Sequence, residues 1–127
     1  MRSLLTVFVT LLISTVSASE FKVGNNAIRS VYDGDSFNVA FRLAHIDTPE
    51  IRGKCAREKR LAIQARDFTR AFFKANRKID IKVVTIGKYG RPIVEVRSES
   101  GYLNQMLLEK QLARPYQGSR SDWCAPE

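Results

Sequence analysis

The feature that most constrains this chain is a long stretch of helical hydrophobic periodicity in the middle of the sequence. Across residues 56–75, apolar residues recur at spacings of four, three and four, which marks one face of an amphipathic helix. These residues are Leu61, Ala65, Phe68 and Phe72. Asn76 is a suitable stop for that helix. We therefore expect one long helix that packs a single apolar face onto the rest of the fold.

On both sides of this helix the apolar residues alternate with a period of two, which is typical of strands. We expect a short strand and turn in 21–31, a strand over 36–46, strands over 79–85 and 91–97 joined as a hairpin, and a second helix over 103–112. The order favours an α+β, mainly β, fold. It predicts a small five-stranded antiparallel barrel of the OB type with helices packed on it.

The first 18 residues have the pattern of an export signal. Arg2 gives a positive start, residues 4–13 are almost purely apolar, and Val16-Ser17-Ala18 fits a small-x-small cleavage site. The apolar run is short of the about 20 residues that a bilayer span requires. We expect a signal peptide at 1–18, one domain at 19–127, no stable membrane association after cleavage, and a periplasmic or secreted protein.

The charge of the chain favours a polyanionic partner. Lys and Arg number 21 against 13 Asp and Glu, a net charge of +8, and loss of Arg2 with the signal leaves +7. Nucleic acid is the commonest partner of such a protein, because phosphates dominate the long-range attraction. Positive charge also serves solubility alone, and anionic membrane competes as a partner. We expect a monomer that binds nucleic acid.

Two cysteines, Cys55 and Cys124, follow the expected signal. An exported chain meets an oxidising compartment, so one disulfide is the simplest interpretation. It would close a loop of about 70 residues and contribute roughly 4 kcal/mol in the chain-entropy model. Two free thiols or a metal site are the alternatives, although two cysteines and one histidine are too few for a structural zinc.

Three acidic residues stand where strands meet turns. Asp35 follows a glycine turn, and Asp47 closes the strand expected after it. Two such aspartates can bind one hard cation, Ca²⁺ or Mg²⁺, through their oxygens. Glu50 lies three residues past Asp47, across a proline, where it can act as a general base toward water.

Two arginines complete this set. Arg42 lies inside the strand that ends at Asp47, and Arg91 opens a later strand. A guanidinium is a planar fork that matches phosphate oxygens in pairs. Arginines and a metal ion around a phosphate stabilise the charge that builds up during attack on phosphorus.

Each motif alone has an ordinary explanation as a turn, a loop or a hairpin tip. Together and in this order they resemble the staphylococcal nuclease (thermonuclease) family. The motifs are Val31-Tyr32-Asp33-Gly34-Asp35-Ser36, Phe41-Arg42-Leu43-Ala44-His45-Ile46-Asp47-Thr48-Pro49-Glu50, Lys88-Tyr89-Gly90-Arg91, Leu103-Asn104 and Leu112-Ala113. The similarity covers roughly residues 27–116.

The resemblance implies an OB-fold, Ca²⁺-dependent nuclease, with Mg²⁺ or another divalent ion as an alternative, that cleaves DNA and/or RNA as an endonuclease. It makes Asp35, Asp47 and the Thr48 carbonyl the metal ligands, with Asp33 behind them. Glu50 would activate water, and Arg42 and Arg91 would hold the phosphate. Lys88, Tyr89 and Tyr116 would contact the nucleotide. Water would displace the 5′ oxygen and leave a 3′-phosphate.

The chain departs from the family pattern in places. The stretch from Ser36 to Phe41 is short, which predicts a tighter hairpin there, and Gln111 stands where glycine is common. His45 is expected to be a packing or partly exposed residue and not a base, and Trp123 is expected to pack the tail rather than to stack on a base. A non-catalytic nucleic-acid-binding OB-fold module is the alternative function, and a structural protein with incidental charge is a third. Survival of both arginines with all three carboxylates favours the enzyme.

Overall fold

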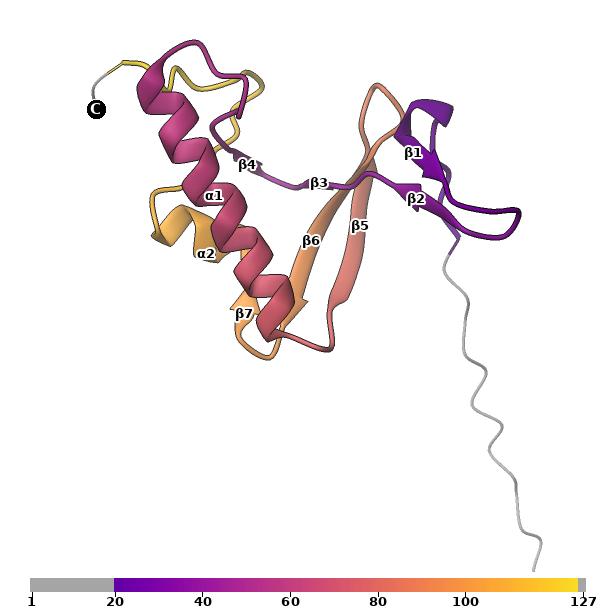
Figure 1. Ribbon diagram of the computed structural model, residues 1–127. Coiled ribbons are helices and arrows are strands. Elements are labelled where there is room, and N and C mark those ends of the chain that lie inside the picture. The colour runs from indigo at the N-terminus through magenta and orange to yellow at the C-terminus, as the bar shows by residue number, and fades with distance from the viewer. Residues whose placement is uncertain (1–19, 126–127) are drawn as a thin grey trace, which may run out of the picture.

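The computed structural model describes residues 20–125, so the expected signal at 1–18 lies outside the described part of the chain. Figure 1 shows the arrangement of the elements. In chain order they are η1 (Asn25–Ala27), β1 (Ile28–Val31), β2 (Phe37–Val39), β3 (Arg42–Leu43), β4 (Ile46–Asp47), α1 (Ala56–Ala75), β5 (Asp80–Ile86), β6 (Pro92–Ser98), β7 (Gly101–Tyr102), α2 (Leu103–Glu109) and β8 (Arg114–Pro115). None of the helices in residues 20–125 is long and apolar enough to cross a bilayer.

Helix α1 has the predicted bounds, and both of its ends are capped. Cys55 is the N-cap residue, and its sulfur accepts a hydrogen bond from the Glu58 N–H. At the other end, the Asn76 side-chain amide donates to the Phe72 carbonyl at 2.7 Å. These contacts satisfy backbone groups that a helix end otherwise leaves unpaired. The predicted apolar face is turned inward, with Phe72 fully buried.

Strand β6 is the centre of the largest sheet. It pairs antiparallel with β5 and β7 and parallel with β3. Within residues 20–125, β1–β2 and β4–β8 form two further antiparallel pairs, and the three sets of strands do not join into a closed ring. The α+β class is confirmed. The parallel β3–β6 pair differs from the wholly antiparallel barrel that we expected.

The strand expected over 36–46 is divided into β2, β3 and β4, which follow one another almost in a line (Figure 1). Only Ala40 and Phe41 separate β2 from β3. A two-residue hairpin turn requires positive φ at one or both of its residues, and neither of these has it. The expected tight hairpin is therefore absent, and the β1–β2 hairpin stands away from the sheet.

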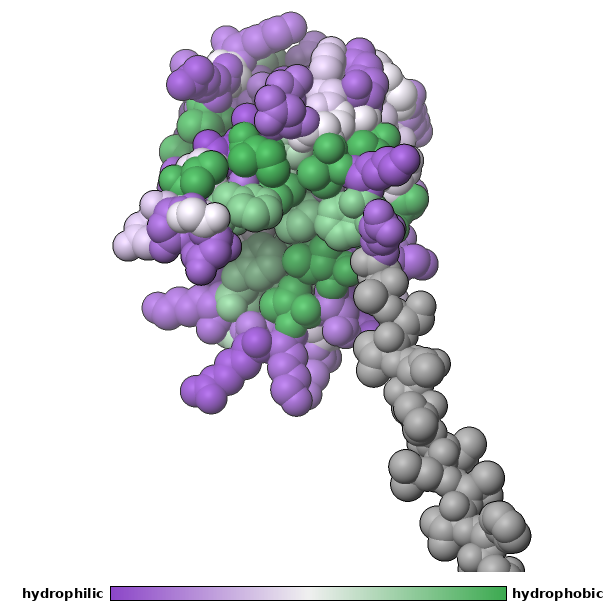
Figure 2. Space-filling view, turned by 90° about the vertical axis from the view of Figure 1, so that its right-hand side faces the viewer, coloured by the Kyte–Doolittle hydropathy of each residue, from purple (hydrophilic) through white to green (hydrophobic). Residues whose placement is uncertain are grey.

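The open side of the sheet exposes apolar surface. Figure 2 views the molecule from the side that carries the β1–β2 hairpin and shows hydrophobic side chains gathered around a hollow. The exposed large hydrophobic residues of the hairpin, of its continuation and of β5 include Val31, Phe37, Phe41, Ile81 and Val84. Because β1 and β2 do not close over β5 and β6, no layer within residues 20–125 covers these side chains.

The core lies between β6 and the two helices. Its buried members are Ile46, Ala65, Phe72, Val94, Val96, Leu103, Leu107, Leu112 and Ala113. Every second residue of β6 from Pro92 to Val96 is buried, which is the pattern of a strand with one face on a core. This core holds β3 and β4 against β6.

Helix α2 ends earlier than predicted because Gln111 adopts a left-handed conformation with φ of 59°. After it, the Leu112 N–H turns back to the Leu107 carbonyl at 2.9 Å, and the Gln111 N–H bonds to the Leu108 carbonyl at 3.0 Å. This is the geometry of a helix C-terminus that usually carries glycine. It gives a physical reason for the glycine that is common at this position in the family pattern.

We expect Gln111→Gly to stabilise the fold. A residue with a Cβ costs about 1–2 kcal/mol in the left-handed region, and the greater freedom of glycine in the unfolded chain offsets part of that cost. The free energy of unfolding should rise by about 0.5–1 kcal/mol in urea titrations followed by circular dichroism. Gln105→Gly, inside α2, is the matched control and should lower it by about 1 kcal/mol. A lower stability for Gln111→Gly would contradict this account.

Candidate functional site

Six of the predicted site residues meet at one pocket of about 380 Å³, which we call the site pocket. It is lined by Phe41, Arg42, Leu43, Ile46, Asp47, Thr48, Glu50, Arg91, Tyr116 and Arg120. The residues come from β3 and the residue before it, β4 and the loop after it, the residue before β6, and the C-terminal tail, residues 116–125. Of the predicted set, Arg42, Asp47, Thr48, Glu50, Arg91 and Tyr116 are brought together.

The two predicted arginines share the pocket because of strand register. In the parallel β3–β6 pair, Arg42 lies opposite Ile93. Arg91 comes shortly before Ile93 in the chain and therefore lies near Arg42. Burial lowers the pKa of Arg91, and repulsion from Arg42 and Arg29 lowers it further. Within residues 20–125 none of these three guanidiniums forms an ion pair with a carboxylate. Unpaired positive charges at one place favour an anionic ligand such as a phosphate.

Asp47 is almost completely buried, with 3 % of its surface exposed. Its Oδ2 accepts hydrogen bonds from the Trp123 indole N–H at 2.9 Å and the Ser121 N–H at 3.0 Å. Its Oδ1 lies 3.7 Å from Nε of Arg120. A buried carboxylate requires such partners, and here all three come from the tail.

Glu50 has a different environment. Its side chain is 55 % exposed, and its Oε2 lies 3.0 Å from Nη1 of Arg120. Within residues 20–125 no other group pairs with this carboxylate. Glu50 is therefore an exposed carboxylate that lines the same pocket as Arg42 and Arg91, where water can reach it.

Glu58, which sequence reasoning missed, holds the loop that carries Glu50. Its buried carboxylate accepts hydrogen bonds from the N–H groups of Lys54 at 2.9 Å and Glu50 at 3.2 Å, and from Arg120 Nη2 at 3.0 Å. The pKa of Glu58 is lowered, chiefly by the Lys54 N–H and then by the Glu50 N–H and Arg120, against the effect of burial. A side chain at Gly53 would collide with Glu58, which explains the glycine.

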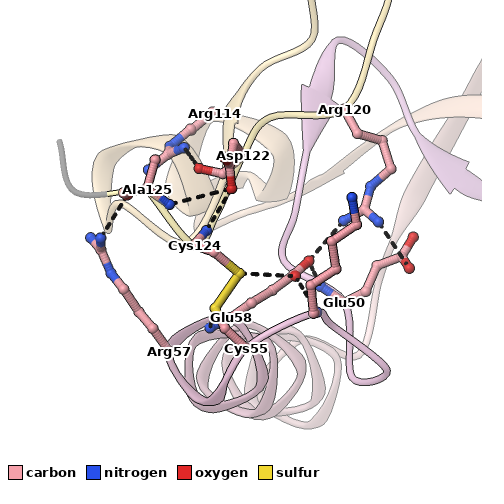
Figure 3. The surroundings of a disulfide bond; sticks show 10 residues. Glu50, Cys55, Arg57, Glu58, Arg114, Arg120, Asp122, Cys124 and Ala125 are labelled. Carbon is pink, nitrogen blue, oxygen red and sulfur yellow. Dashed lines mark hydrogen bonds and ion pairs between the residues drawn. A yellow bond between two sulfur atoms is a disulfide. The ribbon is translucent and has the colours of Figure 1, made fainter.

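The C-terminal tail is attached to α1 by the predicted disulfide, which is confirmed. Cys55 and Cys124 are bonded, with their Cα atoms 5.9 Å apart (Figure 3). Trp123 packs the tail as expected, and it also hydrogen-bonds Asp47. The Arg114 guanidinium stacks on its ring at 4.2 Å. The tail is thus part of the site and not an appendage.

Asp33 and Asp35 do not reach the site pocket. Both are exposed at the tip of the β1–β2 hairpin, which points away from β4 (Figure 1), and Asp35 accepts a hydrogen bond from Ser36 at 3.1 Å. Within residues 20–125 no three His, Cys, Asp or Glu residues are grouped to hold a metal ion. The donors expected for Ca²⁺, namely Asp35, Asp47 and the Thr48 carbonyl, are therefore not assembled. The absent reversal between β2 and β3 is the physical reason.

A larger hollow of about 790 Å³ adjoins the site pocket and shares Arg42, Arg91 and Tyr116 with it. We call it the basic groove. It also contains Arg29, Lys88 and Tyr89, so all three predicted nucleotide contacts lie on it. Arg42 lies over the Tyr116 ring at 5.1 Å, and Lys88 lies over the Tyr89 ring at 4.9 Å. Basic side chains with exposed aromatic rings are typical of single-stranded nucleic-acid grooves.

The hydrogen bonds of the buried Asn104 side chain give a structural reason for the Leu-Asn motif. Its side-chain amide donates to the carbonyls of Ala44 at 3.0 Å and Val94 at 3.2 Å, and its oxygen accepts from the Val96 N–H at 3.1 Å. This buried residue ties the link between β3 and β4 to β6 and so supports Arg42. His45 lies in that link, is exposed and has φ of 65°, and its Nε2 is 3.5 Å from the Glu95 carboxylate.

The sequence profile of the staphylococcal nuclease homologue family matches residues 40–125. The chain belongs to the staphylococcal nuclease family. The match begins after Asp33 and Asp35, but it includes the site pocket and the tail. Comparison with curated proteins gives no match. Membership supports a nuclease or a nucleic-acid-binding module of this family, and it confirms the resemblance seen in the motifs.

The family's Lys-Tyr-Gly-Arg turn is placed here by a contact between two glycines. Gly90 has φ of 80°, and its carbonyl accepts a hydrogen bond from the Gly24 N–H at 2.8 Å. A Cβ on Gly90 would collide with the Gly24 backbone. This close approach positions Lys88, Tyr89 and Arg91 on the basic groove.

We expect Gly90→Ala to displace this turn. The substitution adds a backbone clash to a left-handed conformation, so the free energy of unfolding should fall by about 1–3 kcal/mol. Affinity for a single-stranded oligonucleotide should fall as well, as measured by fluorescence anisotropy at fixed salt. Gly34→Ala is the control, since a Cβ there meets nothing within 4 Å, and it should change stability by less than about 0.5 kcal/mol. Equal behaviour of the two variants would refute the role of the contact.

Proposed function

We propose that this protein is an exported enzyme that hydrolyses phosphodiester bonds of DNA and/or RNA. The observation that carries the proposal is the site pocket, where two unpaired guanidiniums, Arg42 and Arg91, lie beside the exposed carboxylate of Glu50. Positive groups that await an anion, next to a base that faces water, are what hydrolysis of a phosphate ester needs.

The basic groove would bind the nucleic acid strand. Arg29 and Lys88 supply charge for the phosphates, and Tyr89 and Tyr116 supply rings for stacking. Stacking tolerates every base, and phosphate contacts carry no sequence information. We therefore propose cleavage with low sequence specificity inside the strand, as an endonuclease.

In the proposed reaction Glu50 takes a proton from water, and the water oxygen forms a bond to phosphorus. The bond from phosphorus to the 5′ oxygen breaks, and that oxygen gains a proton from solvent. The products are a 3′-phosphate and a 5′-hydroxyl. Arg42 and Arg91 orient the phosphate and balance the charge that develops on its oxygens. A positioned base contributes about 10²–10⁴-fold to the rate, and a positioned donor about 10²–10³-fold.

A divalent cofactor is part of the proposal on family membership alone. Ca²⁺ is the first choice, with Mg²⁺ or another divalent ion as the alternative. No step above passes through it, because Asp35 stands apart from Asp47 and Thr48. Export to the periplasm or beyond is supported by the disulfide, which forms and persists in oxidising compartments. We also propose a monomer that is free of the membrane after signal cleavage.

A non-catalytic nucleic-acid-binding module is the second candidate. The position of Asp35, away from the other carboxylates, favours it, while the basic groove serves either function. Cleavage itself separates the two candidates.

We expect the purified oxidised protein to cut labelled single- and double-stranded substrates and to leave 3′-phosphate ends. Glu50→Gln should bind the same substrates with similar affinity but cleave them about 10²–10⁴-fold more slowly. Glu99→Gln, an exposed carboxylate on the β6–β7 turn, is the control and should cleave normally. Tight binding by the wild-type protein, with no cleavage in any divalent ion, would establish the binding module instead.

We expect millimolar Ca²⁺ to raise the thermal midpoint, because a ligand bound only by the folded state stabilises it. The gain is about 2.7 kcal/mol at a hundred times the dissociation constant. Full cleavage in excess chelator, with no thermal shift in Ca²⁺, would remove the cofactor from the proposal and leave hydrolysis in place.

A further inference from the structure

We propose that Arg120 is a positioning residue for Glu50 and that the Cys55–Cys124 disulfide delivers it to the site. This inference rests on the proposed hydrolysis. Arg120 was not among the residues that the motifs indicated, and it lies in the tail, far along the chain from Glu50.

The contacts of Arg120 are unusual for a surface arginine. Nη1 lies 3.0 Å from Glu50, Nη2 lies 3.0 Å from Glu58, and Nε lies 3.7 Å from Asp47. Figure 3 shows the guanidinium reaching from the tail toward Glu50 and Glu58. One planar group thus connects three carboxylates that come from β4, the loop after it, and α1.

The three carboxylates differ in burial and in how many partners hold them, and this gives Arg120 its role. Asp47 and Glu58 are buried and held by several hydrogen bonds, whereas the exposed Glu50 carboxylate has no partner except Arg120 within residues 20–125. An exposed ion pair adds little to stability. What this one supplies is orientation, because it ties the free carboxylate to two anchored ones. A lysine has no rigid fork with which to do the same.

Arg120 is held in place by the residues that follow it. The Ser121 N–H and the Trp123 indole bind Asp47, and Cys124 is bonded to Cys55 at the start of α1. Glu58 stands three residues after Cys55 on that helix. The disulfide therefore fastens the segment that carries Arg120 to the segment that carries Glu58, and the oriented form of Glu50 requires the oxidised chain.

The test compares Arg120→Ala and Arg120→Lys with the wild-type protein in steady-state cleavage of one oligonucleotide. We expect kcat to fall about 10- to 100-fold in both, because small displacements of a reacting group cost rates of this size, with KM changed by less than about threefold. Arg77→Ala removes an equal charge from an exposed position and should retain kcat. Millimolar guanidinium should restore part of the kcat of Arg120→Ala, with sodium chloride at equal ionic strength as the control, and should not restore Glu50→Gln.

A second measurement tests the disulfide. Cys55→Ser/Cys124→Ser should lower kcat to a similar extent, and adding Arg120→Ala to it should lower kcat little further, because both changes remove the same orientation. Full additivity of the two effects would overturn the link between them.

The outcomes separate the two proposals. If the wild-type protein cleaves and Arg120→Ala retains or increases kcat, the positioning role is refuted and hydrolysis stands. A rise in KM with kcat unchanged also refutes it, since Arg120 would then bind substrate. If Arg120→Ala does not fold, Arg120→Lys decides, and an unchanged kcat in that variant refutes the role. If the wild-type protein does not cleave, both proposals fail.

Discussion

The buried carboxylate of Asp47 is the constraint on which the site depends. A charged residue that is only 3 % exposed is unfavourable unless hydrogen bonds and opposite charge compensate its burial. Here the compensation comes from Trp123, Ser121 and Arg120, so burial of one side chain on β4 requires the tail to lie against it. The β4–β8 pair starts the tail in that direction, and the disulfide holds its far end. The site is therefore closed by the tail, residues 116–125, which follows β8 and contains no helix or strand.

Regular elements were predictable where a local pattern decides them. The apolar face of α1 and the alternation of β5 and β6 follow from neighbouring residues alone, and Cys55 and Cys124 left one simple pairing. The position of the β1–β2 hairpin did not follow, because it depends on whether Ala40 and Phe41 can reverse the chain. Their side chains disfavour the positive φ of a tight turn, and the expected barrel stays open.

The residues of the candidate site were also predictable only in part. Arg42, Asp47 and Glu50 were predictable because they stand together in one motif, and Arg91 because it belongs to a second. Glu58 and Arg120 carried no such signal: one is an acidic residue in the first turn of a helix, and the other is one of 21 basic residues. The role of Arg120 arises from contacts between segments more than 60 residues apart, and that of Glu58 from bonds to the Lys54 and Glu50 N–H groups, which no motif marks. Sequence patterns identify groups that react more readily than groups that orient them.

The charges of the site pocket suggest how a member of this family can bind a phosphate although its Asp35 lies outside the pocket. Asp47, Glu50 and Glu58 place three carboxylates near one another, and a single guanidinium from the tail contacts all of them. Arg42 and Arg91 are left without acidic partners among residues 20–125, so they remain available to a phosphate. Arg42 and Arg91 line the same pocket as Asp47 and Glu50, so without Arg120 they could pair with these carboxylates, and that pairing would withdraw them from substrate. By this argument Arg120 serves Glu50 directly and the phosphate-binding arginines indirectly, because it satisfies the carboxylates that compete for them.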